Sequence, residues 1–352
     1  MPYCMPKLAI SLTAAAGVGF ATLGGAAADP VRMTLQYHFN PVLPVLGDAA
    51  QHFTDTVNRI AEDQIRLRPY EADKLVPTFE TLDAVRDGTL DSALGWPGYF
   101  MGKIPALTLF AAVPFGPNAD EYVAWMMHGN GGQLASELFE ANGVHATFCG
   151  VIAAEASGWF RKAIDDLDDL KGLKIRYAGL GGEALARLGA SVTVLAAGEI
   201  FPNLEKGVLD ATEFSMPSID KNLGFYKVAK HYYFPGWHQP GSTAFLMVNK
   251  QKWDGLTDLQ QGLLEAACNS TVIFELGASY AQQGAAMEYY RKEGVSIETW
   301  KPELLEEFRK ASAEVLEEQS AADADFKRIL DDQNAFLAEL RGWSTVGAFQ
   351  AQ

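Results

Sequence analysis

The chain has 352 residues, of which 48% are hydrophobic and 20% are charged, and its formal net charge is −16. This length predicts about two domains, each large enough for its own core. The acidity excludes nucleic acids and anionic membranes as natural partners, because both would be repelled. An anionic ligand would need a local positive group.

Residues 1–28 have the composition of a secretory signal peptide. Lys7 precedes a stretch of small and apolar residues, and an A-x-A site follows at 26–28. We expect cleavage after Ala28 and export of a soluble mature chain. Cys4 lies before the apolar stretch, which disfavours a lipoprotein, and no later run offers about 18 continuous apolar residues.

Short apolar runs alternate with helical patterns along the mature chain, which predicts an α/β fold. The predicted strands are 33–37, 65–70, 92–95, 144–152, 174–178, 191–195 and 244–249. The predicted helices are 49–62, 78–86, 120–141, 182–188 and 259–293. From Pro302 to Leu340 apolar residues keep a helical period among charged ones. These last helices could pack on their own lobe or on a second subunit, forming a homodimer, and both alternatives stay open.

Two segments of the chain resemble each other. "VRDGTLDSALGWP" (85–97) and "LEKGVLDATEFSMP" (204–217) both combine a helix end, a glycine, Leu-Asp and a later proline. Gly88 and Gly207 suit the position after a helix, where positive φ favours glycine. Either such junctions are simply common in α/β folds, or two similar lobes each deliver a strand end to one shared place.

Two cysteines remain in the mature chain, Cys149 in a predicted strand and Cys268 in a predicted helix. Export permits a disulfide bond between them, but a single pair does not define a disulfide framework. Two inert buried thiols are the favoured interpretation, and a 149–268 bridge is the alternative.

The segment "YAGLGGEALARLG" (177–189) places Gly179, Gly181 and Ala184 at the spacing of a dinucleotide-binding turn. That motif belongs on the first strand of a nucleotide domain, with an acidic residue about 20 positions later, near Glu199. Here the motif lies mid-chain, after a strand that carries Arg176, in a chain expected to be exported. The dinucleotide interpretation is therefore the weaker one.

Four blocks make another assignment more specific. They are "GKIPALTLFAAVPFG" (102–116), "SGWFRKAIDDLDDLKGLKIR" (157–176), "GLKIRYAGLGGEALARLGASVTVLAAGEIFPNLEKGVLDATEF" (172–214) and "LGFYKVAKHYYFPGWHQPG" (223–241). In this order they resemble the DctP-type substrate-binding proteins of TRAP transporters, most closely the branch that captures 2-oxo and 2-hydroxy acids. The resemblance runs from about residue 31 to the last quarter of the chain.

The resemblance implies a two-lobed periplasmic binding protein of the α/β class that closes on a small organic acid and delivers it to a membrane permease. The lobes would be 29–150 with 245–300, and 151–244, joined by crossing segments and braced by a long helix, with a helical segment at 301–352. The arginine matching Arg176 pairs with the ligand carboxylate in the family. Positions matching Glu155, Glu213 and the Phe214 backbone help hold a cation, Ca²⁺ or Na⁺, that bridges protein and ligand.

Physical chemistry supports a ligand role for Arg176 independently. A guanidinium offers paired donors to a carboxylate and stays protonated, and a buried arginine is costly unless it is paired. A structural salt bridge with an acidic residue of the same chain is the alternative. Glu213 ends a predicted strand, where open α/β sheets place ligands.

The sequence departs from the family at several positions. Glu155 replaces the usual glutamine, and this extra negative charge favours Ca²⁺ over a monovalent ion; without a cation, Glu155 could meet an amino group of the ligand. Phe214 replaces tryptophan. In "GWPGYFMGK" (95–103), Tyr99 and Phe100 stand in a block that usually has two tyrosines and a tryptophan, so the ligand could be larger than pyruvate or lactate.

Further candidates are less specific. The loop "PGWHQPG" (235–241) offers His238 and Gln239 as ligand contacts. Trp159 and Asn203 are weaker candidates for the cleft, and Tyr99 is either a hydrogen-bonding lid residue or part of the core.

The leading hypothesis is a transport binding protein that catalyses no reaction and needs no catalytic cofactor. Its ligand is a 2-oxo or 2-hydroxy monocarboxylate, with a larger acid, a dicarboxylate, a sulfonate or an amino-bearing compound as alternatives. A metal-assisted hydrolase using Glu155, Glu213 and His238 is disfavoured, because neither H-E-x-x-H nor G-x-S-x-G occurs. A sensory ligand-binding domain is a third possibility.

Overall fold

The computed structural model describes Met1 and residues 30–61 and 63–347. The predicted signal peptide, apart from Met1, lies outside the described residues. Within the described part, no helix combines the length and the apolar character needed to cross a membrane.

The first sheet has the strand order β2-β1-β3-β10-β4. Its strands are β1 (Val31–Tyr37), β2 (Ile65–Tyr70), β3 (Ser92–Gly95), β4 (Val144–Ile152) and β10 (Ser242–Asn249). β1 runs parallel to β2 and β3, whereas β10 is antiparallel to β3 and β4. Three of the predicted strands, 65–70, 92–95 and 144–152, have the predicted bounds.

The second sheet has the order β11-β9-β5-β8-β6-β7. Its strands are β5 (Gly158–Phe160), β6 (Lys174–Arg176), β7 (Ser191–Thr193), β8 (Ala211–Thr212), β9 (His231–Phe234) and β11 (Ser296–Thr299). β11 pairs with β9, so this strand belongs to the second sheet. The expectation that 245–300 lies wholly in the first lobe is wrong there.

The two sheets contain the same parallel unit, β2-β1-β3 in one and β7-β6-β8 in the other. The aspartates of the two Leu-Asp pairs make equivalent contacts: Asp91 accepts from the N–H of Thr34, and Asp210 accepts from the N–H of Lys174. Gly88 and Gly207 have φ values of 74° and 73°. The internal similarity therefore marks two similar lobes, as the second interpretation predicts.

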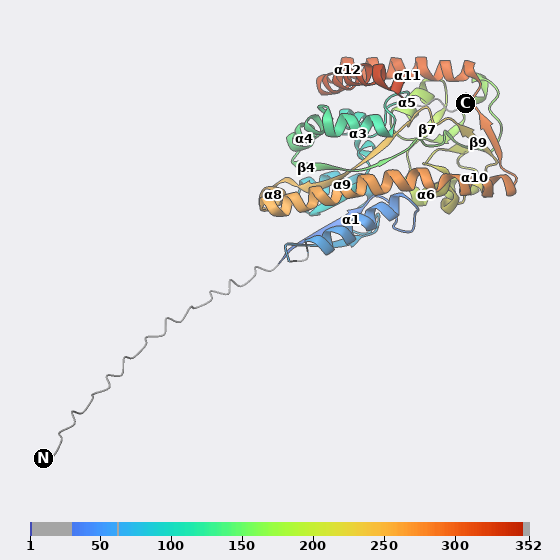
Figure 1. Cartoon of the computed structure of the whole chain (residues 1–352). Coiled ribbons are helices and arrows are strands. Elements are labelled where there is room, and N and C mark those ends of the chain that lie inside the picture. Colours follow the sequence, from blue (N-terminus) through green and yellow to red (C-terminus); the bar gives the residue numbers. More distant parts are fainter. Residues whose placement is uncertain (2–29, 62, 348–352) are drawn as a thin grey trace.

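Helices cover both sheets (Figure 1). They are α1 (Leu46–Ile60), α2 (Thr81–Arg86), α3 (Ala119–His128), α4 (Gly131–Ala141), α5 (Gly179–Arg187), α6 (Ala197–Glu205), α7 (Pro217–Leu223), α8 (Lys250–Asp254), α9 (Asp258–Ala281), α10 (Gln283–Lys292), α11 (Pro302–Ala322) and α12 (Ala324–Gly347). Short 3-10 turns occupy Thr78–Glu80, Pro97–Phe100, Pro105–Phe110, Leu167–Leu170 and Phe225–Lys227. The predicted helices 120–141 and 259–293 are each divided in two, the second at Gln282.

α9 and α10 extend along one side of the molecule, from the first sheet to the second (Figure 1). α9 packs on β4 and α1, and α10 packs on α7. Cys149 of β4 forms a disulfide bond with Cys268 of α9. The preference for two free thiols is therefore wrong, because the chain brings this strand and this helix into direct contact.

The C-terminal helices pack on their own chain. α11 lies against α5 of the second lobe, and α12 lies against α3 and α4 of the first. On α12, Asp332 accepts hydrogen bonds from Trp125 Nε1 and Asn130 Nδ2. The last helices thus pack on both lobes of their own chain, and a homodimer through them stays a prediction.

Candidate functional site

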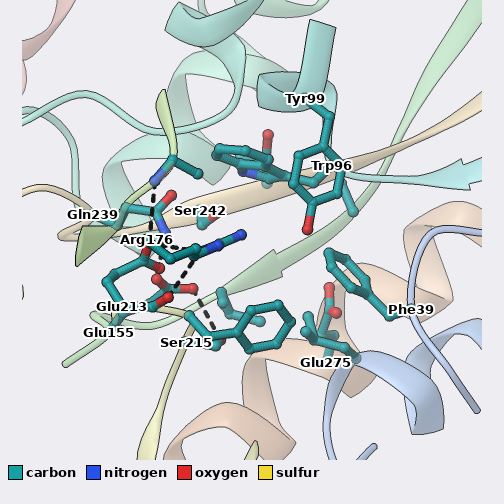
Figure 2. A pocket seen from close by; sticks show the side chains of 16 residues that line it. Phe39, Trp96, Tyr99, Glu155, Arg176, Glu213, Ser215, Gln239, Ser242 and Glu275 are labelled. Atoms are coloured by element: carbon teal, nitrogen blue, oxygen red, sulfur yellow. Dashed lines mark hydrogen bonds and ion pairs between the residues drawn. The ribbon is translucent and has the colours of Figure 1, made fainter. Parts of the chain in front are cut away.

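A small cavity of about 40 Å³ lies between the two lobes (Figure 2). Its lining residues are Phe39, Leu46, Trp96, Tyr99, Ile152, Glu155, Arg176, Ala178, Glu213, Phe214, Ser215, Gln239, Ser242, Thr243, Ala244 and Glu275. Trp96 follows β3, and Glu213 follows β8, so the equivalent strand ends of the two lobes meet here. Ligands of open α/β sheets bind at such carboxyl ends.

Arg176, the last residue of β6, reaches this cavity although its side chain is only 2% exposed. Its Nε donates to the carbonyl oxygen of Leu195, and its Nη1 donates to the carbonyl and carboxylate oxygens of Glu213, at 2.8 and 2.9 Å. The outer end of the guanidinium points into the cavity (Figure 2). The internal ion pair with Glu213 is therefore observed, and it orients Arg176 without sealing it from the cavity, so the ligand role stays a prediction.

Two buried carboxylates lie beside this arginine. Burial and the charge of Glu213 raise the pKa of Glu155 well above its ordinary value. Burial is the largest influence on Glu213 and raises its pKa, but the Arg176 guanidinium, the His238 ring and the Ala178 N–H together outweigh it, so the net shift is downward. Ser215 Oγ donates to Glu155 at 2.9 Å, and Gln239 Nε2 donates to its other oxygen. One permanently positive group, the Arg176 guanidinium, therefore lies beside two carboxyl groups that can each carry a negative charge.

His238 completes the cluster from the loop after β9. Its Nε2 lies 3.7 Å from a Glu213 oxygen and 3.8 Å from a Glu155 oxygen, too far for hydrogen bonds. Within the described residues neither ring nitrogen has a hydrogen-bond partner. One donor atom from each of the three side chains falls within 4.8 Å of the others. Two carboxylates around a buried nitrogen without a partner fit a bound cation, and their oxygen atoms suit Ca²⁺ or Na⁺.

Aromatic side chains form the opposite wall. Tyr99 packs edge-on against Trp96, with 5.0 Å between the ring centroids. The ring centroid of Phe39 lies 6.2 Å from those of Tyr99 and Phe214. Burial raises the pKa of Tyr99 to about 12, partly offset by the neighbouring Arg176. Its phenol therefore stays protonated and can donate to a ligand oxygen.

Four predicted residues do not line this cavity. Phe100 is fully buried and packs against His38 in the first lobe. Trp159 stacks on Tyr232 and donates to Asp220, and Asn203 is on the outer surface, bonded to the Glu199 carbonyl oxygen. As cleft residues these candidates are wrong, because each side chain points into a core or to solvent. His238, the fourth, is buried and lies against Glu155 and Glu213 without lining the cavity itself.

The structure adds residues that the sequence did not single out. Phe39 and Glu275 line the cavity on the side opposite to Arg176 (Figure 2). Glu275 lies in a predicted helix, but no motif distinguished it from the many other glutamates of the chain.

The glycine spacing at 179–184 has a packing explanation. A β-carbon at Gly181 would lie 2.6 Å from His238 Cβ and 3.0 Å from the Tyr177 ring. The glycine lets α5 approach the loop that carries His238, so it serves the site through packing and requires no nucleotide.

Residues 38–323 match the DctP family, described as "Bacterial extracellular solute-binding protein, family 7". The chain belongs to this family. Its members are transport solute-binding proteins, and the family is not one of enzymes.

Relatives of this solute-binding protein have known ligands. A monocarboxylate 2-oxoacid-binding periplasmic protein of Nostoc sp. is 34% identical over 297 residues, which cover 84% of this chain and 82% of that protein. A TRAP transporter solute binding protein from Bordetella bronchiseptica with bound calcium and picolinate has a TM-score of 0.88 and 31% identity, covering 91% of this chain and 95% of that chain. One from Pseudoalteromonas atlantica with bound sodium and pyruvate has a TM-score of 0.86 and 30% identity, covering 90% and 96%. The predicted family and two-lobed α/β fold are confirmed.

Proposed function

We propose that this protein is the periplasmic solute-binding subunit of a TRAP transporter and captures a 2-oxo or 2-hydroxy monocarboxylate between its lobes. The observation that carries the proposal is the Arg176 guanidinium at the cavity, beside the Glu155, Glu213 and His238 cluster. The names of the relatives, which describe 2-oxoacid and pyruvate binding, support this ligand class.

Charge balance explains why a cation would be needed. With both glutamates ionised, Arg176 leaves the cluster one unit negative, so a ligand carboxylate alone would add to the repulsion. A divalent cation held by Glu155, Glu213 and the Phe214 carbonyl would bring the complex with the ligand to neutrality. Ca²⁺, which prefers several oxygen ligands, fits this better than Na⁺. When bound, it would polarise the ligand's carboxylate and oxo oxygens, and Arg176 would fix the carboxylate orientation.

Ligand binding would favour the closed arrangement seen here. Phe39 of the first lobe contacts Phe214 of the second, and Trp96 clusters with Ala178 across the cavity. A ligand that touches both walls binds the closed state more tightly and so selects it. The closed surface would then be recognised by the membrane permease, and no covalent step is needed. We place the protein in the periplasm on the basis of its predicted signal peptide and its family. A homodimer through 301–352 remains a prediction.

Calorimetry with pyruvate and 2-oxobutyrate tests the proposal. We expect the wild-type protein to bind these acids at least about 100-fold more tightly with Ca²⁺ than after chelation, since an uncompensated charge in a buried site costs several kcal/mol. Glu155→Gln should lower the affinity for Ca²⁺ and shift the cation preference toward Na⁺. Glu199→Gln, at an exposed position of α6, is the matched control. Binding that is indifferent to chelation would refute the cation bridge, and absence of binding would refute the ligand class.

A further inference from the structure

Glu275 is a third acidic residue of the cavity, and the proposed function leaves it unused. It comes from α9, is only 3% exposed, and lies across the cavity from Arg176, next to Phe39 (Figure 2). It also lines an adjoining small cavity of about 20 Å³ between α1, α9 and the first sheet. Glu275 therefore stands where the binding cavity continues beyond the space that the cation cluster uses.

The fold makes room for this carboxyl group. A β-carbon on Gly150 of β4 would collide with Glu275 Oε2. The pairing of β4 with β10 also shifts register at Ala244 and Phe245, and Ala244 lines both cavities. A glycine within a strand weakens it and often marks a close approach, and bulges are frequent next to binding sites. Gly150 and the register shift thus leave space for the Glu275 carboxyl group on α9, at a position where an apolar side chain would be expected in a core.

The chemistry of this wall selects a hydrogen-bond donor. Among the described residues that line the two cavities, Arg176 is the one with a permanently positive side chain, and it lies at the opposite end. A second ligand carboxylate would therefore meet Glu275 without a neutralising cation. The Val151 N–H is one partner of this carboxyl group, and an alkyl chain would leave its remaining hydrogen-bonding capacity unused in a buried place, which is costly. A hydroxyl or ammonium group matches the acceptor oxygens.

We propose that the ligand is a 2-oxo acid whose chain carries a hydrogen-bond donor, a hydroxyl or an ammonium group, and that Glu275 binds this donor. The inference rests on the proposed function, because the cation cluster and Arg176 fix the end of the ligand that bears the carboxylate. Burial raises the pKa of Glu275 to about 8. A neutral carboxyl group suits a hydroxyl partner, whereas an ammonium partner would displace its proton.

The test compares 2-oxobutyrate with 4-hydroxy-2-oxobutyrate, 4-amino-2-oxobutyrate and 2-oxoglutarate by calorimetry in the presence of Ca²⁺. Wild-type protein should bind the hydroxy or amino acid at least about fivefold more tightly than 2-oxobutyrate, in the range of one net hydrogen bond. Glu275→Leu should abolish this preference. Glu275→Gln should retain it for the hydroxy acid and lose it for the amino acid, which identifies the donor. Glu265→Leu, at an exposed position of α9, should leave all affinities unchanged.

Equal or tighter binding of 2-oxobutyrate by the wild-type protein would overturn this inference while the proposed function stands. Preference for 2-oxoglutarate would also overturn it, because Glu275 would then share a proton with a second carboxylate. If none of these acids nor pyruvate binds with Ca²⁺, both the inference and the proposed function fail. Melting curves of the unliganded variants show whether each one is folded.

Discussion

Arg176 is the residue on which ligand capture depends most directly. Its ion pair with Glu213 holds the guanidinium in one orientation, so a ligand carboxylate would meet a preorganised pair of donors. In Arg176→Lys the charge remains, but the planar fork is lost. We expect the affinity for pyruvate with Ca²⁺ to fall by at least about 30-fold, which corresponds to the lower end, ~2 kcal/mol, of the cost of disrupting a buried charge pair.

The same substitution at an exposed position provides the control. Arg187 on α5 pairs with Glu314 and Glu318 of α11 at the surface, so Arg187→Lys should bind pyruvate like the wild type. Calorimetry measures the affinities, and melting of the unliganded variants reports folding. Unchanged binding by a folded Arg176→Lys protein would show that the arginine serves only as the internal partner of Glu213.

At the scale of elements, the sequence predicts best where the hydrophobic pattern is long. β2, β3 and β4 have the predicted bounds because each is a compact apolar or alternating run between clear turn signals. β5, β9 and β11 were missed, since runs of three or four residues carry almost no periodicity of their own and these three, unlike β3 and β8, follow no Gly-x-Leu-Asp junction. They depend on neighbouring strands for their structure.

The residues of the site also divide into those that the sequence predicts and those that it does not. Arg176, Glu155, Glu213 and Gln239 could be predicted because they stand in family motifs or at strand ends. Glu275 could not, because it lies on a helix whose neighbours Ile273 and Phe274 are exposed, which reverses the usual pattern of a buried apolar face. Only the packing of α9 on β4 reveals which way its carboxyl group points.

The disulfide bond joins two such elements, β4 and α9, across a sequence separation of 119 residues. Closing a loop of this length restricts the unfolded chain. We expect the double variant Cys149→Ala, Cys268→Ala to lose about 2–5 kcal/mol of unfolding free energy. Denaturant unfolding measures this loss. A reductant should destabilise the wild-type protein and leave the double variant unchanged; equal stability of both proteins without reductant would contradict the prediction.

At the scale of the whole molecule, acidic groups are buried around the cavity, and their burial makes the free energy of unfolding depend on pH. The titratable or charged side chains that share the two cavities with Glu275 are Tyr37, Tyr99, Glu155, Arg176 and Glu213. Asp220, beneath the cluster, also has its pKa raised by burial, to about 7. Groups of this kind hold protons in the folded state that they release on unfolding.

Glu275 provides the clearest case, because its pKa rises from 4.5 to about 8 on burial. Between these values the folded protein binds a proton that the unfolded chain does not. Unfolding free energy therefore falls as pH rises through this range, by at most about 1.4 kcal/mol per pH unit from this group, and levels off above it.

Glu275→Gln cannot titrate, so its stability relative to the wild type should increase steadily from pH 5 to pH 8. Urea unfolding of the unliganded proteins measures the difference, in which the contributions of Glu155 and Asp220 cancel. Glu265→Gln, at a solvated position of the same helix, should follow the wild-type curve, whereas parallel curves for wild type and Glu275→Gln would show that Glu275 is already ionised inside the closed protein.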